Sequence, residues 1–210
     1  MNSLQKCCIH FLALILMSLV LGCSSKPLSI SANIKDLPIA NVNIQNVRSL
    51  NVNAAMQTDL RLGAIDTSPS HLVGIGTSIY PNSKQFALGI PKFSKRTIDN
   101  ISLESHYYFT PSDSLVKVVL YEWSDGFKWD DVNKYYQKET FDDLFQSVRN
   151  KLTVALGEPA HVKIKSRKYN SKTVRDEVKW ISQRGLNAYL FMFTNDDTKF
   201  KQIRLAVYEE

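Results

Sequence analysis

Cysteine is scarce in this chain and confined to its beginning. The 210 residues hold three cysteines, Cys7, Cys8 and Cys23, and none follows position 23. The part of the chain after Cys23 therefore has no disulfide, no thiolate metal site and no cysteine nucleophile. Its fold has to be held together by its core alone.

The sequence also lacks the short motifs of common catalytic and cofactor sites. It contains no HExxH zinc pattern, no GxxxxGK[ST] phosphate loop, no GxGxxG dinucleotide loop and no GxSxG serine elbow. His71, His106 and His161 lie far apart, and none has a second His or Cys at the spacing of metal ligands. We expect these histidines to be structural or exposed, and we expect no metal and no other cofactor.

The charge of the chain excludes one class of partner. Its formal net charge is +6 at pH 7, and removal of Lys6 with an N-terminal segment would leave +5 (6 − 1). This mildly basic balance suits contact with anionic head groups or acidic polymers, but it is far from the strongly basic character of nucleic-acid-binding domains. We therefore expect no nucleic-acid partner.

An apolar run near the start carries the clearest signal in the sequence. Residues 9–23 read IHFLALILMSLVLGC, after Lys6 and before the polar stretch 24–27. The run is shorter than the ~20 residues of a membrane-spanning helix and has the length of a signal-peptide core. Together with Gly22-Cys23 it resembles the signal peptide and lipobox of bacterial lipoproteins, although Val20 and Leu21 depart from the usual preference for Leu and then a small residue.

The resemblance implies a membrane-anchored lipoprotein of the bacterial cell envelope. Residues 1–22 would be the removed signal peptide, Cys23 the lipid attachment site and residues 23–36 a lipidated tether. Two or more acyl chains anchor a protein stably, whereas one gives only marginal binding. Ser24 after the lipid site points to the outer membrane if the organism is diderm. An uncleaved N-terminal anchor and an ordinary secretory signal are the alternatives.

Hydrophobic patterning predicts one α+β globular domain over residues 37–210. Strands are predicted at 101–109 and 115–123, joined by the turn-forming cluster 110–114, and further strands at 161–167, 175–182, 188–194 and 201–208. Short connections favour an antiparallel sheet of about five to seven strands. Residues 37–70 are predicted to be a loosely packed N-terminal part, because the apolar–polar alternation at 50–53 and 60–62 indicates only short strands.

One amphipathic helix is predicted over residues 140–156, packed on one face of the sheet. Apolar side chains recur there at helical spacing, namely Phe141, Leu144, Phe145, Val148, Leu152 and Leu156. Thr140 is a suitable N-cap, and Gly157 followed by Pro159 ends the pattern.

Two stretches are candidate partner surfaces. The first is an aromatic connection that holds Phe127, Trp129, Tyr135 and Tyr136, which either contacts a partner or caps one end of the sheet. The second is a basic run from 163 to 175 that includes Lys163, Lys165, Arg167 and Lys168. It is either a solvated hairpin or a contact with an anionic surface, such as lipid head groups or acidic envelope polymer.

These observations favour a non-enzymatic, lipid-anchored binding or assembly module with an envelope protein or polymer as partner. An envelope immunity or inhibitor lipoprotein would have the same sequence features. A glycan or peptidoglycan hydrolase is a third hypothesis, which rests on the neighbouring carboxylates Asp130 and Asp131 among aromatic residues.

The lipid assignment predicts the outcome of labelling. Metabolic labelling with a fatty-acid probe should mark the wild-type protein and leave Cys23→Ser unlabelled, because no other cysteine follows a complete apolar run. Equal labelling of both proteins would show that the anchor is elsewhere.

Overall fold

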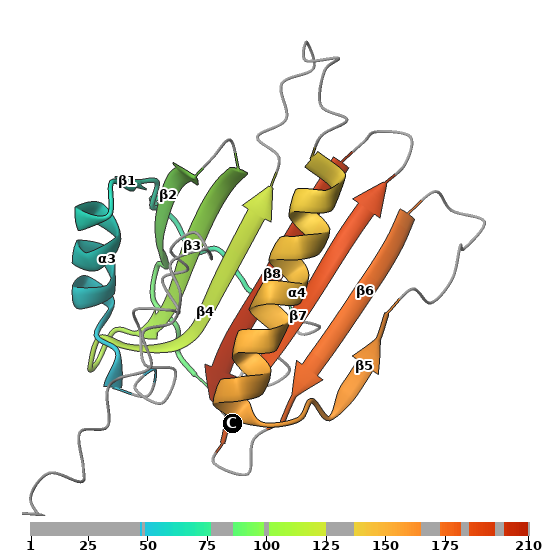
Figure 1. The fold of residues 1–210 in the computed structure, drawn as a ribbon. Helices are drawn as coiled ribbons and strands as arrows, with labels where there is room; N and C mark the ends of the chain where they lie inside the picture. Colours follow the sequence, from blue (N-terminus) through green and yellow to red (C-terminus); the bar gives the residue numbers. More distant parts are fainter. Residues whose placement is uncertain are drawn as a thin grey trace, which may run out of the picture. The chain divides into compact units, whose positions relative to one another are not determined.

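A single antiparallel β-sheet organises the chain in its computed structural model (Figure 1). The structure describes residues 47, 49–76, 86–98, 101–124, 137–164, 173–181, 185–195 and 200–209. Every pair of neighbouring strands in the sheet is antiparallel.

The sheet is larger than the sequence predicts. Its strands are β1 (Ile65–Asp66), β2 (Lys92–Ile98), β3 (Ile101–Thr110), β4 (Leu115–Ser124), β5 (His161–Lys163), β6 (Thr173–Trp180), β7 (Leu186–Asn195) and β8 (Phe200–Glu209). The described residues add two α-helices, α3 (Val52–Arg61) and α4 (Gln137–Leu156). The prediction of about five to seven strands and one main helix is therefore wrong in number, and the described part of the chain is largely β.

The order of the strands places the last one in the middle. The sheet runs β1-β2-β3-β4-β8-β7-β6-β5, so β8 separates the strands that precede α4 from those that follow it (Figure 1). Strand β8 pairs with β4 over Val118↔Tyr208 to Ser124↔Gln202, and with β7 along its full length.

The hairpin of β3 and β4 confirms its prediction. Ser114 has a positive φ of 58°, and its backbone N–H donates to the Thr110 carbonyl at 2.9 Å. The Asp113 side chain accepts hydrogen bonds from the Leu115 N–H at 3.0 Å and from the Thr110 hydroxyl. Side-chain capping of this kind is what makes Asp and Ser turn-formers, and it explains why the cluster 110–114 could be recognised from sequence.

Helix α3 replaces the short strands that the sequence predicts at 50–53 and 60–62. Asn51 is its N-cap, and its side-chain oxygen accepts from the Asn53 N–H at 2.9 Å. The buried residues of α3, namely Val52, Ala55, Met56 and Asp59, follow helical spacing. Alternation over four residues is too short a signal to exclude a helix, and one of the four inward positions is polar, which hides the helical period.

The sequence does not predict strand β2, because its residues KFSKRTI show no alternation of apolar and polar side chains. Only Phe93 and Ile98 are large and apolar. The strand is recognisable only from its seven paired residues with β3.

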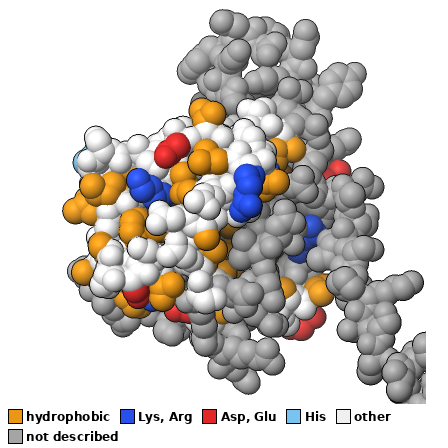
Figure 2. All heavy atoms as spheres, turned by 90° about the vertical axis from the view of Figure 1, so that its left-hand side faces the viewer, with side chains coloured by type: hydrophobic (Ala, Val, Ile, Leu, Met, Phe, Trp, Pro, Cys, Tyr) orange, Lys and Arg blue, Asp and Glu red, His pale blue; other side chains and the backbone are white. Residues whose placement is uncertain are grey.

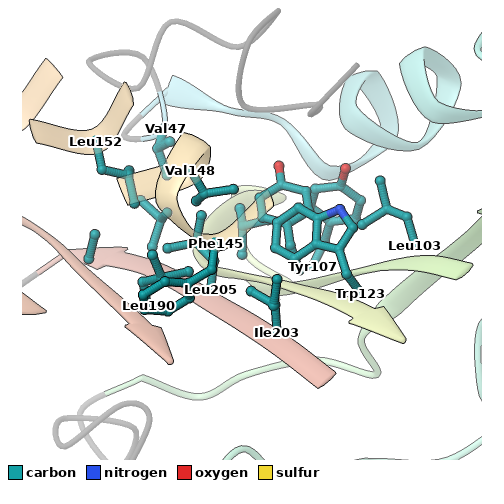
Figure 3. Packing of buried hydrophobic residues seen from close by; sticks show 14 of the residues in the cluster. Val47, Leu103, Tyr107, Trp123, Phe145, Val148, Leu152, Leu190, Ile203 and Leu205 are labelled. Atoms are coloured by element: carbon teal, nitrogen blue, oxygen red, sulfur yellow. The ribbon is translucent and has the colours of Figure 1, made fainter. Parts of the chain in front are cut away.

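Helix α4 covers one face of the sheet over β7 and β8, as predicted (Figure 1). Phe141, Phe145, Val148 and Leu152 are buried, and Leu144 and Leu156 are partly buried against the same cluster. Figure 3 shows Phe145 of α4 beside Leu190 and Leu205 of the sheet. Gly157 has φ +89°, which suits the helix end that the sequence predicts. Neither described helix has the length and hydropathy needed to cross a bilayer.

The opposite face of the sheet, called the helix-free face below, has a smaller apolar cluster. Its buried members are Tyr108, Val118, Leu120, Tyr189, Phe191, Ala206 and Tyr208. Ile75, Phe86 and Leu88, which lie between β1 and β2 in the chain, pack against this cluster. Alternation along each strand thus sends one set of side chains to α4 and the other to the helix-free face.

The packing of α4 predicts a large difference between two neighbouring positions. Leu152 is 1% exposed, so Leu152→Ala should lower the free energy of unfolding by ~2–5 kcal/mol. Val154 is 86% exposed, and Val154→Ala should change it by less than about 0.5 kcal/mol. Chemical denaturation measures both, and similar losses at the two positions would contradict the placement of the helix.

Candidate functional site

Most of the residues that the sequence singles out lie outside the described part of the chain. These are Cys23, Phe127, Trp129, Tyr135, Tyr136, Lys165, Arg167 and Lys168, together with Asp130 and Asp131. Lys163 is described and lies in β5, the last strand of the sheet order. Among the histidines, His71 and His161 are exposed and His106 is buried.

The strand registers bring charged residues into one row across the helix-free face. From β2 to β5, consecutive paired positions are Lys95, Glu104, Glu122, Arg204, Phe191, Glu177 and Lys163. Six of these seven side chains are ionisable, although the seven strands that carry them are scattered over the sequence. We call this set the charged row and regard it as the candidate site.

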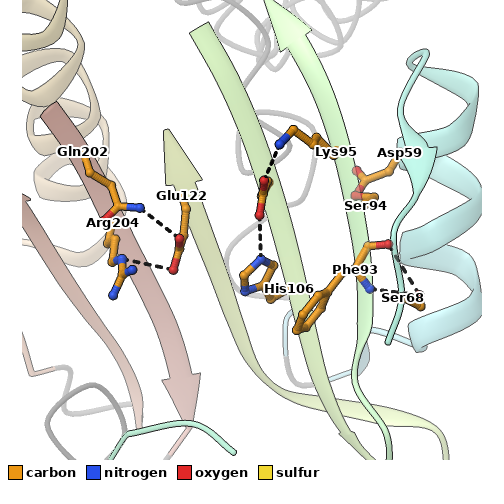
Figure 4. A network of polar contacts seen from close by, with 10 residues as sticks. Asp59, Ser68, Phe93, Ser94, Lys95, His106, Glu122, Gln202 and Arg204 are labelled. Carbon is orange, nitrogen blue, oxygen red and sulfur yellow. Dashed lines mark hydrogen bonds and ion pairs between the residues drawn. The ribbon is translucent and has the colours of Figure 1, made fainter. Parts of the chain in front are cut away.

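The β2–β3 end of the charged row is a three-residue network (Figure 4). Lys95 Nζ lies 2.7 Å from Glu104 Oε1, and His106 Nε2 lies 3.4 Å from Glu104 Oε2. The hydrogen bond with His106, reinforced by Lys95, lowers the pKa of the Glu104 carboxyl to about 2 despite its partial burial. The His106 ring stacks on Phe93 with 3.9 Å between ring centres, which fixes its orientation.

The middle of the charged row is held by Glu122. Its carboxylate lies 3.0 Å from Arg204 Nε and accepts a hydrogen bond from Gln202 Nε2 at 3.1 Å (Figure 4). The charge of Glu122 also contributes, after burial, to raising the pKa of the Tyr108 hydroxyl to about 12. Glu122 therefore serves as the anchor for two side chains of β8.

The β6–β7 end combines a cation with aromatic rings. The Arg175 guanidinium carbon lies 5.6, 4.9 and 5.3 Å from the ring centres of Tyr189, Phe191 and Phe193. These rings are successive helix-free positions of β7, so a single arginine spans all three. Such cation–π contacts favour a cation held flat against the sheet.

Glu177 is the only described carboxylate in the charged row at this end. It accepts a hydrogen bond from the Tyr189 hydroxyl at 2.7 Å and lies 3.2 Å from Arg175 Nε and 3.4 Å from His161 Nε2. Burial acts to raise the pKa of Glu177, but the Tyr189 hydrogen bond and the charges of Arg175, Lys163 and Lys179 outweigh burial, so the pKa lies below its ordinary value. One carboxylate is thus surrounded by three cations.

The arrangement suits binding better than acid–base catalysis. Glu104 and Glu122 occupy directly paired positions, but each carboxylate has its own cationic partner. A carboxyl with a pKa of about 2 is ionised at neutral pH and has no proton to donate. Within the described residues, no three His, Cys, Asp or Glu side chains are grouped as metal ligands would be.

A second polar cluster lies under α3 and is structural. The Asp59 carboxylate is 2% exposed and accepts hydrogen bonds from the Tyr107 hydroxyl at 2.8 Å and from the Ser94 hydroxyl. Burial, reinforced by Asp59, raises the pKa of both Tyr107 and Tyr121. Because this carboxylate joins α3 to β2 and β3 and is inaccessible, we assign it to holding the helix in place.

The side of the domain that carries α3 and β1 has no comparable row of charges among the described residues. Figure 2 views this side and shows apolar side chains interspersed with polar groups and a few charges. Leu60 and Ile65 are exposed singly, as is common on protein surfaces.

Sequence reasoning missed most of the charged row for a physical reason. Four strands contribute the side chains of Lys95, Glu104, Glu122 and Arg204. Their alignment depends on how these strands pair, which no local sequence pattern predicts. A local signal was present in β6, where Glu177 and Lys179 alternate with Val178 and Trp180, and in β8, where Arg204 alternates with Ile203 and Leu205. That alternation predicts a strand with a charged face.

Comparison of the chain with protein-family models, with curated proteins and with solved structures gives no match.

The pKa of Glu104 predicts a pH-dependent contribution to stability. Because its pKa is lower in the folded protein than the ordinary 4.5, ionised Glu104 stabilises the fold fully above about pH 4.5 and loses this effect as pH falls towards 2. Glu104→Gln should be less stable than the wild type at pH 6, by at most about 1 kcal/mol for such a partly exposed group.

Denaturation at pH 6, 4 and 2.5 checks this expectation. The difference between wild type and Glu104→Gln should shrink towards pH 2.5. Lys95→Gln should reduce the pH dependence by a smaller amount, since the His106 contact is the stronger influence on Glu104. Parallel pH profiles for wild type and Glu104→Gln would refute the role given to this carboxylate.

Proposed function

We propose that this protein is a lipid-anchored, non-enzymatic lipoprotein of the bacterial cell envelope that acts as a binding or assembly module. Its anchor is Cys23, and its binding surface is the charged row on the helix-free face. The observation that carries the proposal is the alignment of six ionisable side chains across seven strands.

Such a row is more than a fold requires. Half-exposed ion pairs contribute little to stability, because solvent screens them and long side chains lose freedom when they are held. Complementary charges do give specificity and faster association when a partner carries the opposite pattern. Glu104 and Glu122 are each paired with a cation, whereas three cations lie around Glu177 at the β5–β6 end, so the face has two different charge environments.

The length of the tether agrees with this use. The predicted tether comprises residues 23–36, and a flexible chain of about 13 residues spans roughly 20 Å. A domain on such a tether can turn its helix-free face towards a partner in the aqueous space. A partner embedded in the bilayer is not required.

An envelope immunity or inhibitor lipoprotein would use the same anchor and the same surface. The charged row also suits that function, since inhibitors of charged enzymes associate through complementary charge. The nature of the captured partner, a toxic enzyme or a component of the envelope, distinguishes the two functions. The hydrolase hypothesis depends on Asp130 and Asp131 and draws no support from the carboxylates of the charged row.

Photo-cross-linking in the native envelope tests the proposed surface. A photoreactive residue replaces Lys95 or Lys179 on the helix-free face, or Val154 on the outer side of α4, in the full lipidated chain. Both helix-free positions should give adducts several-fold stronger than position 154, which is more exposed than either.

The stability of the three variants serves as the control in this experiment. Melting temperatures of the three variants should agree within a few degrees, which excludes misfolding as the cause of a lost adduct. Adducts that are strongest from position 154 would place the partner on α4 and overturn the assignment of the charged row.

A further inference from the structure

Strand β1 is a weakly held edge of the sheet. Strand β2 pairs with β3 through seven residues but with β1 through only two, Ile65↔Lys95 and Asp66↔Ser94. Both side chains of β1 are exposed, and neither belongs to an apolar cluster. Backbone and polar contacts therefore hold β1 in place without help from the core. A segment with so few apolar contacts opens locally at a small cost in free energy.

Residues 64–68, called the edge segment below, cover the outer side of β2 at a few points. The Phe93 N–H donates to the Ser68 hydroxyl oxygen at 3.1 Å (Figure 4). The Phe93 carbonyl accepts from the Thr67 N–H at 3.0 Å. Just before the edge segment, Gly63 has φ +85°, a conformation that glycine adopts without strain. The edge segment thus begins after a glycine turn and ends at a serine that caps the backbone of β2.

Strand β2 is basic, and the strand beside it carries an acid. The seven residues of β2 include no carboxylate and three cations, namely Lys92, Lys95 and Arg96. The one charged residue of β1 is Asp66. Hydrogen bonds from Ser68, with a smaller contribution from the charge of Lys92, outweigh burial and lower the pKa of the Asp66 carboxyl, so Asp66 is ionised at neutral pH. Acidic side chains therefore favour a strand at this position.

Pairing fixes the side of the sheet on which each residue of β1 lies. Ile65 is paired with Lys95 of the charged row and lies on the helix-free side. Its neighbour Asp66 lies on the opposite side, with Lys92, because successive strand residues alternate. Lys95 already has Glu104 as its ionic partner at 2.7 Å. Lys92 is therefore the cation that selects an acidic neighbour, and an apolar residue is accepted next to it in the chain.

We propose that a partner displaces the edge segment and that the uncovered edge of β2 binds an extended stretch of that partner protein in which apolar and acidic residues alternate. The incoming strand exchanges the two paired residues of β1 for as many as the seven that β2 offers to β3. Main-chain hydrogen bonds supply the affinity, as is usual when a peptide adds a strand to a sheet. The acidic residues take the place of Asp66 beside Lys92. This inference goes beyond the proposed function, because it requires neither the lipid anchor nor the rest of the charged row.

Two other occupants fit this edge less well. A second copy of the chain that paired its β2 with this β2 would bring together two strands with three cations each. Like charges directly opposite each other destabilise a sheet. A lipid surface supplies anionic groups but no row of amide groups to continue the hydrogen bonding of the edge. An acidic extended peptide supplies both.

Binding of a blocked peptide of about four Val-Glu repeats, roughly the length of β2, tests the inference on the full chain in micelles of a neutral detergent. Val favours an extended conformation, and Glu supplies the carboxylates. Wild type should bind this peptide at least about tenfold more tightly than a Val-Lys peptide of the same length, because like charges oppose the second peptide. Equal binding of the two peptides would overturn the proposed chemistry of the partner.

A reversible disulfide between β1 and β2 provides the decisive variant. Ile65→Cys with Lys95→Cys places two cysteines at directly paired positions, where the Cα atoms of antiparallel strands are within disulfide range. Mass spectrometry of the linked peptides verifies the bond. The oxidised variant should bind the Val-Glu peptide at least about tenfold more weakly than the same protein after reduction, because β1 can then no longer leave the edge. Equal affinities of the oxidised and reduced forms would overturn the proposal.

Two single substitutions test the cap and the cation. Ser68→Ala removes a hydrogen bond of the edge segment and should strengthen binding about threefold. Lys92→Gln should weaken it at least about threefold, whereas Arg149→Gln removes the same charge from α4 and should change it less than about twofold. Equal losses in Lys92→Gln and Arg149→Gln would reduce the effect to net charge and overturn the proposal. Melting curves verify that each variant is folded.

Hydrogen exchange shows whether the edge segment leaves β2. The Thr67 amide donates to Phe93 in the free protein, so saturation with the Val-Glu peptide should make its exchange at least about tenfold faster. Unchanged exchange at Thr67 with the peptide bound would place the peptide elsewhere and overturn the proposal. Failure of the peptide to bind, with the cross-links from positions 95 and 179 retained in the envelope, would overturn this inference alone and leave the proposed function standing.

Discussion

The pairing of β8 with β4 is the constraint on which the rest of the structure depends. Seven residue pairs join strands whose paired residues lie about 80 to 90 positions apart in the chain, from Ser124↔Gln202 to Val118↔Tyr208. Without this pairing, β1–β4 and β5–β7 would be separate antiparallel ribbons, each with an open edge. Closing so long a loop costs chain entropy before the contacts form, which makes this pairing a slow step in folding by comparison with the hairpins.

The same pairing gives the two faces of the sheet their different characters. On one face, Leu190, Ile203 and Leu205 from the centre of the sheet bury against α4 and form the main core (Figure 3). On the other, Arg204 of β8 reaches Glu122 of β4 and joins two groups of charges into one row (Figure 4). A shift of one residue in this register would exchange the faces, placing Arg204 under α4. The apolar core and the candidate site are therefore determined by one alignment.

Local patterns were sufficient where an element carries its own signal. Helix α4 shows six apolar residues at helical spacing and a glycine stop, and the β3–β4 hairpin has a turn whose side chains cap its own backbone. Patterns failed where burial and hydropathy disagree. Helix α3 buries the carboxylate of Asp59 against Tyr107, so its buried side does not show an unbroken apolar pattern with the helical period. Strand β2 has polar residues on both faces, so its sequence does not show the apolar–polar alternation of a strand.

The sequence by itself determined the apolar segment that ends at Cys23, the absence of a second cysteine after it, the main helix and the positions of the six strands β3 to β8. Each of these features depends on residues that are close together in the chain, so a local pattern is enough to recognise it. Only the tertiary structure decided the order of the strands, the central position of β8 and the gathering of Lys95, Glu104, Glu122, Arg204 and Glu177 on one face. The physical reason is that strand registers are set by contacts between segments far apart in the chain, so the sequence of one strand does not identify the strand with which it pairs.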